Sequence, residues 1–216
     1  MIILRGKNEE NVDRAFIESL NSSFDRVVVD IGTGDGKNVY RKAKADGSTL
    51  YIGIDPVKSN MQETSTKLLK KPEKGGLKNV LLVIAAYEKL PDELCGIADS
   101  VTVLFPWGSL LEGVVKPVDA FLDAVRFLSK PGASFEFITT YGEAFEENTI
   151  ETRELPSLSE EYLKGEYSEK LLIAGLTVTE ITKHGNDYVK SFDSAWARRL
   201  AFGRKRDFYR IYGTIK

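Results

Sequence analysis

Segments of five to seven residues that are rich in apolar side chains recur along the first two thirds of the chain and alternate with segments of helical periodicity. Branched and aromatic side chains dominate these runs, which is typical of strands in the middle of a sheet. We therefore expect strands at residues 26–31, 50–54, 80–85, 100–105 and 134–140. Helical spacing of apolar positions predicts helices at residues 38–45, 58–71 and 119–128. Such alternation predicts a doubly wound α/β fold with a mostly parallel sheet.

The two ends of the chain complete this sheet. Further elements are expected at residues 2–5 (strand), 12–20 (helix), 160–174 (helix), 177–182 (strand) and 208–215 (strand). The last two strands are consecutive and can form a hairpin, which makes the final strand antiparallel to the others. The sequence thus predicts a single Rossmann-like domain over residues 1–216, with a seven-stranded sheet that ends in a C-terminal antiparallel strand.

Two long polar segments interrupt the pattern, at residues 142–158 and 185–207. Connections of about two to six residues are usual in α/β units, so both segments are long. Long loops on the ligand side of such a sheet generally carry recognition. We expect these two linkers to contact the substrate.

A glycine-rich segment, Asp30-Ile-Gly-Thr-Gly-Asp-Gly36, lies between the first long strand and the helix that follows it. Gly32 and Gly34 keep side chains out of the turn and permit left-handed backbone angles, so that the backbone can approach a ligand closely. A tight turn whose glycines serve only packing is the alternative interpretation.

Asp55 ends the next strand, roughly 20 residues after the first glycine, where a carboxylate can accept hydrogen bonds from both hydroxyls of a ribose. Asp30 and Asp35 suit a pyrophosphate poorly and a cationic ligand better. The pattern D-x-G-x-G-x-G resembles the S-adenosylmethionine loop of class I methyltransferases, whose ligand carries a sulfonium and an ammonium. The resemblance implies S-adenosylmethionine as cofactor, held by Asp30, Gly32, Gly34 and Asp55.

An aromatic turn, Phe105-Pro106-Trp107-Gly108, follows the strand at 100–105, at the sheet edge where ligands of open α/β sheets bind. Methyltransferases that act on nucleobases commonly have a proline and an aromatic residue here. Trp107 can stack on one face of a base, and Trp196, from the second linker, can supply the other. In the alternative interpretation, Trp107 plugs the sheet edge and Trp196 packs beneath a helix.

The third long strand ends at residues 85–88, where class I enzymes often bind the cofactor adenine. Glu88 is the polar side chain best placed to read the edge of the adenine. It can instead be a solvent-facing acid at the start of a loop.

The formal net charge is −2, but the basic residues are clustered. One cluster comprises Lys67, Lys70, Lys71, Lys74 and Lys78, and a second comprises Arg198, Arg199, Arg204, Lys205, Arg206 and Arg210. Clustered basic residues on a nearly neutral protein most often face a phosphate backbone. Each cluster can also be an ordinary solvated face.

Several classes of site and compartment are excluded by composition. The chain has one cysteine, Cys95, and one histidine, His184, which excludes an internal disulfide and disfavours a zinc site. No run reaches the roughly 18 apolar residues of a membrane span, and the start of the chain is too short for a signal peptide. We expect a cytoplasmic, metal-free protein.

A closer resemblance rests on four segments that occur in order: the glycine loop, Tyr-Ile-Gly-Ile-Asp-Pro at 51–56, Leu-Phe-Pro-Trp-Gly at 104–108, and the basic segment at 194–206. Together they resemble the aminoglycoside-resistance 16S rRNA (adenine-1408-N1)-methyltransferases. By this resemblance the cofactor and target pocket is lined by Gly32, Asp55, Glu88, Leu104 and Ser194 to Trp196. Tyr87 stands where the resemblance implies a small residue beside the cofactor adenine.

The resemblance also implies the partner and the chemistry. Trp107 and Trp196 clamp a flipped adenine, Pro106 and its neighbour Phe105 help to position it, and the protein acts as a monomer on the 30S subunit. The ribosomal RNA is held by Lys67, Lys70, Lys71, Arg153, Arg199, Arg204 and Arg206. Adenine N1 carries a free lone pair, so no general base is required. Two alternatives remain at this point: a tRNA or small-molecule methyltransferase, and a non-catalytic RNA-binding protein on the same fold.

Overall fold

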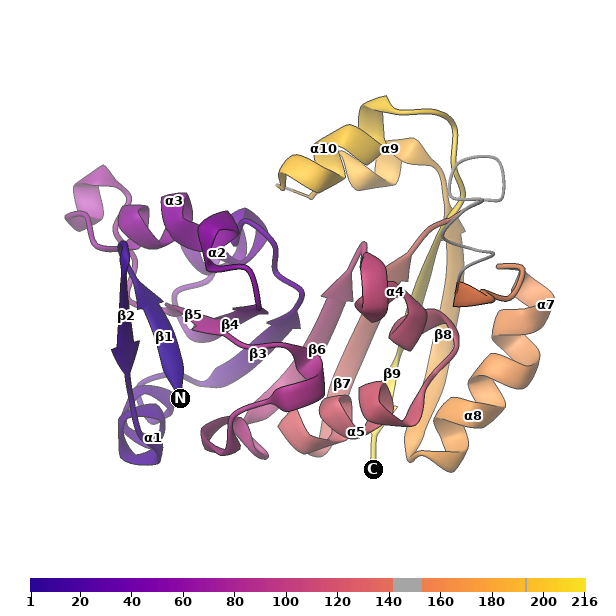
Figure 1. Cartoon of the computed structure of the whole chain (residues 1–216), viewed down its shortest axis with the longest axis horizontal. Helices are drawn as coiled ribbons and strands as arrows, with labels where there is room; N and C mark the ends of the chain where they lie inside the picture. The colour runs from indigo at the N-terminus through magenta and orange to yellow at the C-terminus, as the bar shows by residue number, and fades with distance from the viewer. Residues whose placement is uncertain (142–152, 193) are drawn as a thin grey trace.

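The computed structural model describes residues 1–141, 153–192 and 194–216, which form a nine-stranded sheet with the order β2-β1-β5-β4-β3-β6-β7-β9-β8 (Figure 1). The parallel strands are β3 (Arg26–Ile31), β4 (Thr49–Asp55), β5 (Val80–Ile84), β6 (Ala98–Leu104) and β7 (Ser129–Thr139). The doubly wound, mostly parallel sheet is as the hydrophobic pattern predicts.

The C-terminal hairpin consists of β8 (Leu176–His184) and β9 (Phe208–Ile215). The last strand, β9, inserts between β7 and β8 and runs antiparallel to both, which confirms the expected antiparallel C-terminal strand.

An N-terminal hairpin extends the sheet beyond the expected seven strands: its first strand lies at the expected residues 2–5, whereas its second was not expected. Strand β1 (Ile2–Arg5) pairs antiparallel with β5 through Ile3 and Val83, and β2 (Asn8–Asn11) pairs with β1. The β2 sequence, Asn-Glu-Glu-Asn, carries no apolar residue, so a search for apolar runs misses it. As an exposed edge strand it has no core to face, and its charges protect the edge from pairing with other chains.

The helices lie on both sides of the sheet (Figure 1). They are α1 (Arg14–Asn21), α2 (Lys37–Ala45), α3 (Lys58–Leu68), α4 (Gly108–Val115), α5 (Asp119–Leu128), α7 (Glu160–Tyr162), α8 (Ser168–Ile173), α9 (Asn186–Val189) and α10 (Ala195–Phe202). The expected helix at 160–174 is interrupted by a π-helical turn, Leu163–Tyr167, which contains Gly165 in a non-helical conformation.

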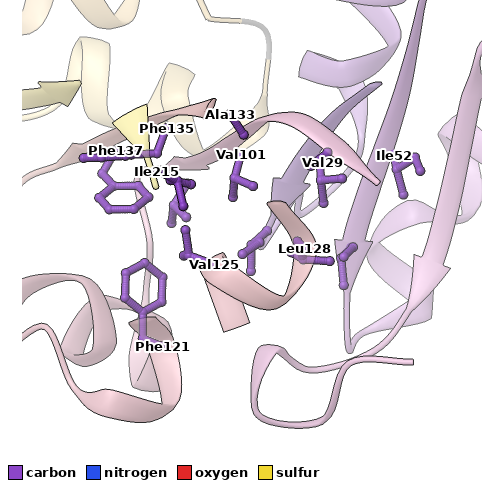
Figure 2. Packing of buried hydrophobic residues seen from close by; sticks show 14 of the residues in the cluster. Val29, Ile52, Val101, Phe121, Val125, Leu128, Ala133, Phe135, Phe137 and Ile215 are labelled. Carbon is purple, nitrogen blue, oxygen red and sulfur yellow. The ribbon is translucent and has the colours of Figure 1, made fainter. Parts of the chain in front are cut away.

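The main core joins one face of the sheet to α5 (Figure 2). Val29 and Val101 from adjacent parallel strands pack with Phe121 and Val125 from the helix, and Phe137 is fully buried beside them. A second cluster packs α2 and α3 against the other face near β4 and β5. These two layers hold the carboxyl ends of the parallel strands in fixed register.

The second expected linker, at 185–207, is not an irregular loop, because it contains α9 and α10. A third small core fixes it, in which Leu200 and Ala201 of α10 pack with Val189 of α9 and Phe208 of β9. Residues 142–152 of the first linker lie outside the described residues. Its described part, residues 153–158, includes Leu155, which packs against α4.

Candidate functional site

A cavity of about 910 Å³ opens at the carboxyl ends of β3, β4, β5 and β6, with the start of α10 on its far side. Every residue expected to bind the cofactor or the base lines it: Asp30, Gly32, Gly34, Asp55, Tyr87, Glu88, Leu104, Phe105, Pro106, Trp107, Ser194 and Trp196. Segments from five parts of the sequence thus converge on one edge of the sheet.

The glycine loop uses its freedom of backbone angle at two positions. Gly32 has φ +72°, and a Cβ there would lie 2.4 Å from the side chain of Leu110. Gly34 has φ +61°, and nothing lies within 4 Å of where its Cβ would be. Gly32 is therefore required both by its angle and by close packing, whereas Gly34 opens backbone toward the cavity.

Asp55 supports the glycine loop while it lines the cavity. Its Oδ2 accepts a hydrogen bond from the Gly34 N–H at 3.0 Å and its Oδ1 accepts one from the Val57 N–H at 2.9 Å. Burial raises the pKa of Asp55 above its ordinary value, and the two backbone bonds oppose that shift. Each carboxylate oxygen keeps one further acceptor position, as binding to a ribose diol requires.

Asp30 lies at the floor of the same cavity with 3% of its surface exposed. Its Oδ1 accepts a hydrogen bond of 2.5 Å from the Thr102 hydroxyl. Burial raises the pKa of Asp30, because the low-dielectric surroundings disfavour its charge. A cationic group in the cavity would favour the ionised carboxylate.

Tyr87 begins a short 3-10 turn at the edge of the cavity, which it lines. The ring packs edge-to-face on Phe121 at 6.0 Å, and its hydroxyl donates to the Ser109 carbonyl at 3.4 Å. The neighbouring Glu88 is exposed at the cavity rim. A large residue at position 87 is thus accommodated by packing beneath α4 and α5.

The turn after β6 adopts an unusual backbone conformation. Phe105 has φ +53°, which is rare for a residue other than glycine. Its ring is buried edge-to-face against Phe192 at 5.1 Å and Phe208 at 5.9 Å, and its N–H donates to the Ile138 carbonyl at 2.7 Å. The buried ring and backbone bond hold the strained residue in place, so Pro106 and Trp107 project over the cavity.

The two tryptophans meet at the mouth of the cavity. Trp107 is 56% exposed and Trp196 is 37% exposed, and their ring centroids lie 5.4 Å apart at an interplanar angle of 67°. A base held between parallel rings needs about 7 Å between them, twice the contact distance between carbon atoms. The expected pair is therefore brought together, but the rings contact each other rather than forming an open parallel sandwich.

Asp35 joins the glycine loop to the helix that carries Trp196. Its Oδ1 accepts from the Lys37 N–H at 3.1 Å, and its Oδ2 accepts from the Ala195 N–H at 3.0 Å. Ser194 caps the same helix, because its hydroxyl accepts from the Ala197 N–H at 3.0 Å. A carboxylate at a helix N-terminus is also favoured by the helix dipole.

The residues expected to bind RNA are distributed around this cavity. Arg199 lines it directly, whereas Lys70 and Lys71 are exposed at the end of α3. Arg153 pairs with Glu112 at 2.6 Å and so is engaged within the protein. The Lys67 ammonium lies 4.1 Å from the centroid of the Tyr40 ring, and the Arg204 and Arg206 backbones are bonded to the Asn186 side chain.

Asn38 is a cavity residue that the sequence reasoning missed. It follows the glycine loop on α2, is 5% exposed, and lines the cavity. Neither polar atom of its amide has a hydrogen-bond partner among the described residues. An unpartnered buried amide beside a cavity indicates a ligand-binding group. A polar residue in the first turn after a glycine loop is a signal that could have identified it.

The residues set aside in the sequence analysis lie elsewhere. His184 stacks on Tyr188 at 3.9 Å, outside the cavity, and Cys95 is an exposed free thiol. In the described ranges, His, Cys, Asp and Glu form no cluster that could hold a metal ion. Over the same ranges, no helix has the length and apolar character needed to cross a membrane.

A parallel sheet whose glycine loop, buried Asp55 and aromatic turn enclose one acid-lined cavity defines a class I S-adenosylmethionine-dependent methyltransferase. The chain belongs to the NpmA family, the 16S rRNA (adenine(1408)-N(1))-methyltransferases, whose model matches residues 2–215. The family, the enzyme class and the cofactor expected from the sequence are confirmed.

Similar proteins support the same assignment along the whole chain. A 16S rRNA (adenine(1408)-N(1))-methyltransferase from Escherichia coli is 49% identical over 216 residues, covering 100% of this chain and 99% of the relative. A mutant of the corresponding enzyme from Catenulisporales acidiphilia, crystallised with cosubstrate S-adenosylmethionine, has a TM-score of 0.89 at 33% identity and covers 100% and 96% of the two chains. An aminoglycoside resistance methyltransferase, NpmB1, has a TM-score of 0.85 at 34% identity, with both chains fully covered.

Proposed function

We propose that the cavity divides into a cofactor half, formed by β3, β4 and β5, and a base half, formed by the turn after β6 and the start of α10. In the cofactor half, Asp55 accepts hydrogen bonds from the ribose, and Asp30 faces the cationic end of the ligand. Glu88 and the backbone at Tyr87 read the adenine edge. The observations that support this are the buried carboxylates, the open backbone at Gly34 and the lining of the cavity.

Further groups complete the cofactor half. Gly32 lets the loop approach the ligand, Leu104 supplies apolar contact, and Ser194 fixes the helix end that closes the cavity. The unpartnered Asn38 amide gains a hydrogen-bond partner when the ligand binds.

The base half positions a flipped adenine between Trp107 and Trp196. Stacking on both faces recovers part of the free energy that unstacking the base from RNA costs. Because the two indoles contact each other in this structure, they must separate to admit the base. Phe105 and Pro106 keep the turn rigid, so Trp196 and its helix are the parts that move.

The chain carries out methyl transfer by positioning rather than by proton transfer. S-adenosylmethionine supplies an electrophilic methyl group on a sulfonium, and the N1 lone pair of adenine forms the new bond as the carbon–sulfur bond breaks. Adenine N1 carries no proton at neutral pH, so no side chain has to act as a base. Holding N1 in line with the methyl carbon is the main contribution of the residues here.

The proposed partner is the 16S rRNA within the assembled 30S subunit. Arg199 lies at the cavity, Lys67 is on α3, and Lys70 and Lys71 follow that helix. In Figure 1, α3 and α10 both lie in the upper part of the view. Arg204 and Arg206 follow α10. Arg153 can join them only by exchanging its pairing with Glu112 for a phosphate. We propose that a cytoplasmic monomer docks in this way.

The product accounts for resistance. Methylation at N1 makes the adenine cationic and removes a hydrogen-bond acceptor. Aminoglycosides are polycations that bind the decoding site, so a positive charge there repels them. The chain is thus proposed to confer aminoglycoside resistance.

The direct test is to map the modified nucleotide on 30S subunits after incubation with the enzyme and S-adenosylmethionine. N1-methylation at adenine 1408, with no modification of free tRNA, is the expected result. Modification of tRNA alone would overturn the proposed substrate.

A further inference from the structure

A second cavity, of about 380 Å³, lies beside the first and is enclosed by α2, α3 and α10. Its lining is strongly basic, because it contains five cationic side chains and one carboxylate, that of Glu63. The cations are Lys37, Arg41, Lys44, Lys67 and Arg198. Neither basic cluster seen in the sequence includes Lys37, Arg41 or Lys44, so this concentration of charge arises from the fold.

The pocket has a built floor rather than being a solvated helix face. The Tyr40 ring is 8% exposed, and its hydroxyl donates to the Gly75 carbonyl at 2.7 Å. The Lys67 ammonium lies 4.1 Å from the centroid of that ring. Packing and hydrogen bonding thus fix the position of one cation at the floor.

Its positive charge is only partly neutralised. Glu63 pairs with Lys37 at 2.9 Å, and this interaction lowers the pKa of Glu63. Arg41 and Lys44 are exposed, and neither pairs with a carboxylate in the described part of the chain. An anion that enters the pocket would be attracted by these like charges and would lower their mutual repulsion.

We propose that this pocket binds backbone phosphates of the 16S rRNA and joins the two basic clusters into one continuous docking surface. Lys67, from the first basic cluster, lies on α3, and Arg198, from the second, lies on α10. Both line the pocket together with Lys37, Arg41 and Lys44 of α2. Arginine forms paired hydrogen bonds with phosphate, and lysine adds point charge. The proposal rests on the proposed function, since it assigns a further part of the rRNA contact.

The pocket also adjoins the cofactor site. Lys37 and Glu63 line both cavities, whereas Arg41 and Lys44 line only the basic one. Substitutions at Arg41 and Lys44 therefore test RNA docking without altering a residue of the cofactor cavity.

The test compares Arg41→Gln, Lys44→Gln and the double variant with Lys42→Gln. Lys42 is a basic residue of the same helix that lines a different cavity, so the control matches the loss of charge. The measurements are affinity for 30S subunits at several salt concentrations, affinity for S-adenosylmethionine, and Tm. We expect the double variant to bind 30S subunits about tenfold more weakly and to lose about 0.7–0.9 from the salt slope for each phosphate contact removed. The double variant should bind S-adenosylmethionine as tightly as the wild type does. The Lys42→Gln variant should bind 30S subunits with the affinity and salt slope of the wild type.

Each other result overturns the inference. An unchanged salt slope in the double variant, or an equal loss in Lys42→Gln, shows that the pocket is not a specific contact. If inorganic phosphate raises the Tm of the wild type but not of the double variant, and 30S binding is unaltered, the pocket binds free phosphate instead. If the wild type itself fails to bind 30S subunits, the proposed function fails rather than this inference alone.

Discussion

The proposed cofactor half and the proposed base half of the cavity differ in how far they are formed without ligand. In the cofactor half, Asp30 and Asp55 are 3% and 8% exposed and are hydrogen-bonded to neighbouring groups. In the base half, Trp107 and Trp196 are 56% and 37% exposed, and their rings contact each other edge-to-face. The first half is built on the central strands, and the second on a turn and a short helix.

This difference indicates which half each ligand must reorganise. The cofactor is a small molecule and meets a site whose carboxylates are already oriented. The adenine arrives as part of a large RNA, whose docking free energy can be used to separate the indoles. On this proposal, discrimination between substrates resides where the protein is adjustable, and we expect only a correctly docked RNA to open the base half.

The largest expected effect on methyl transfer comes from removing either tryptophan of the base half. Trp107→Ala or Trp196→Ala should lower methyl transfer to 30S subunits by about 100-fold or more, since each removes one stacking face and with it the alignment of N1. Cofactor affinity should be unchanged, and the Trp→Phe variants should retain part of the activity. Methylation near the wild-type rate in both alanine variants would exclude the clamp, whereas a large drop in Tm would support packing roles.

The next largest effect is expected on cofactor binding, when Asp55 in the cofactor half is replaced. Asp55→Ala should weaken S-adenosylmethionine binding by about 10- to 100-fold, because hydrogen bonds to a charged group contribute about 1.5–3 kcal/mol. Titration calorimetry measures this, with Asp25→Ala, an exposed acid before the neighbouring strand β3, as the control. Equal affinity of the two variants for S-adenosylmethionine would show that Asp55 does not bind the cofactor.

The pH dependence of cofactor affinity gives a second test of the role of Asp55. Because burial raises the pKa of Asp55 above 3.8, its carboxylate gains a proton at a higher pH than an exposed aspartate does. A protonated carboxyl is a poorer acceptor, so cofactor affinity should fall as pH decreases toward that pKa. Burial also raises the pKa of Asp30, so the wild type is compared with Asp55→Asn. In that variant, cofactor affinity should fall less steeply as pH decreases. Identical pH profiles would contradict the role of Asp55.

A smaller effect tests the link between the halves. Asp35→Ala removes the acceptor of the Ala195 N–H and should slow methylation by about three- to tenfold, in line with the roughly 1 kcal/mol of a lost helix cap. The chain has only two tryptophans, Trp107 and Trp196, so intrinsic fluorescence should shift in this variant. Asp35→Asn keeps one acceptor oxygen and should be intermediate, and Asp123→Ala on α5 is the control. An unchanged spectrum and rate would show that the two halves are independent.

The smallest effect is expected at Tyr87. Tyr87→Phe removes only the long hydrogen bond to the Ser109 carbonyl and keeps the edge-to-face contact with Phe121, so cofactor affinity should change by less than about twofold. A larger loss in calorimetry would show that the hydroxyl contacts the cofactor.

The parallel core, the glycine loop, Asp55 and the aromatic turn could all be predicted from the sequence. These features are local: apolar runs mark strands buried in the sheet, and a strand followed by glycines and a helix defines a site at a known edge. The resemblance of four segments that occur in order along the chain also predicted the family.

The remaining features depend on how the chain packs in three dimensions. The polar strand β2 and the helices α9 and α10 form because neighbouring strands and the small core around Phe208 stabilise them, which no local pattern records. The edge-to-face contact of the indoles, the bond from Ala195 to Asp35 and the basic pocket on α2 each join residues distant in sequence. Such pairings depend on how the layers pack, because the strength of a contact or a charge cluster is set by distance in space rather than along the chain.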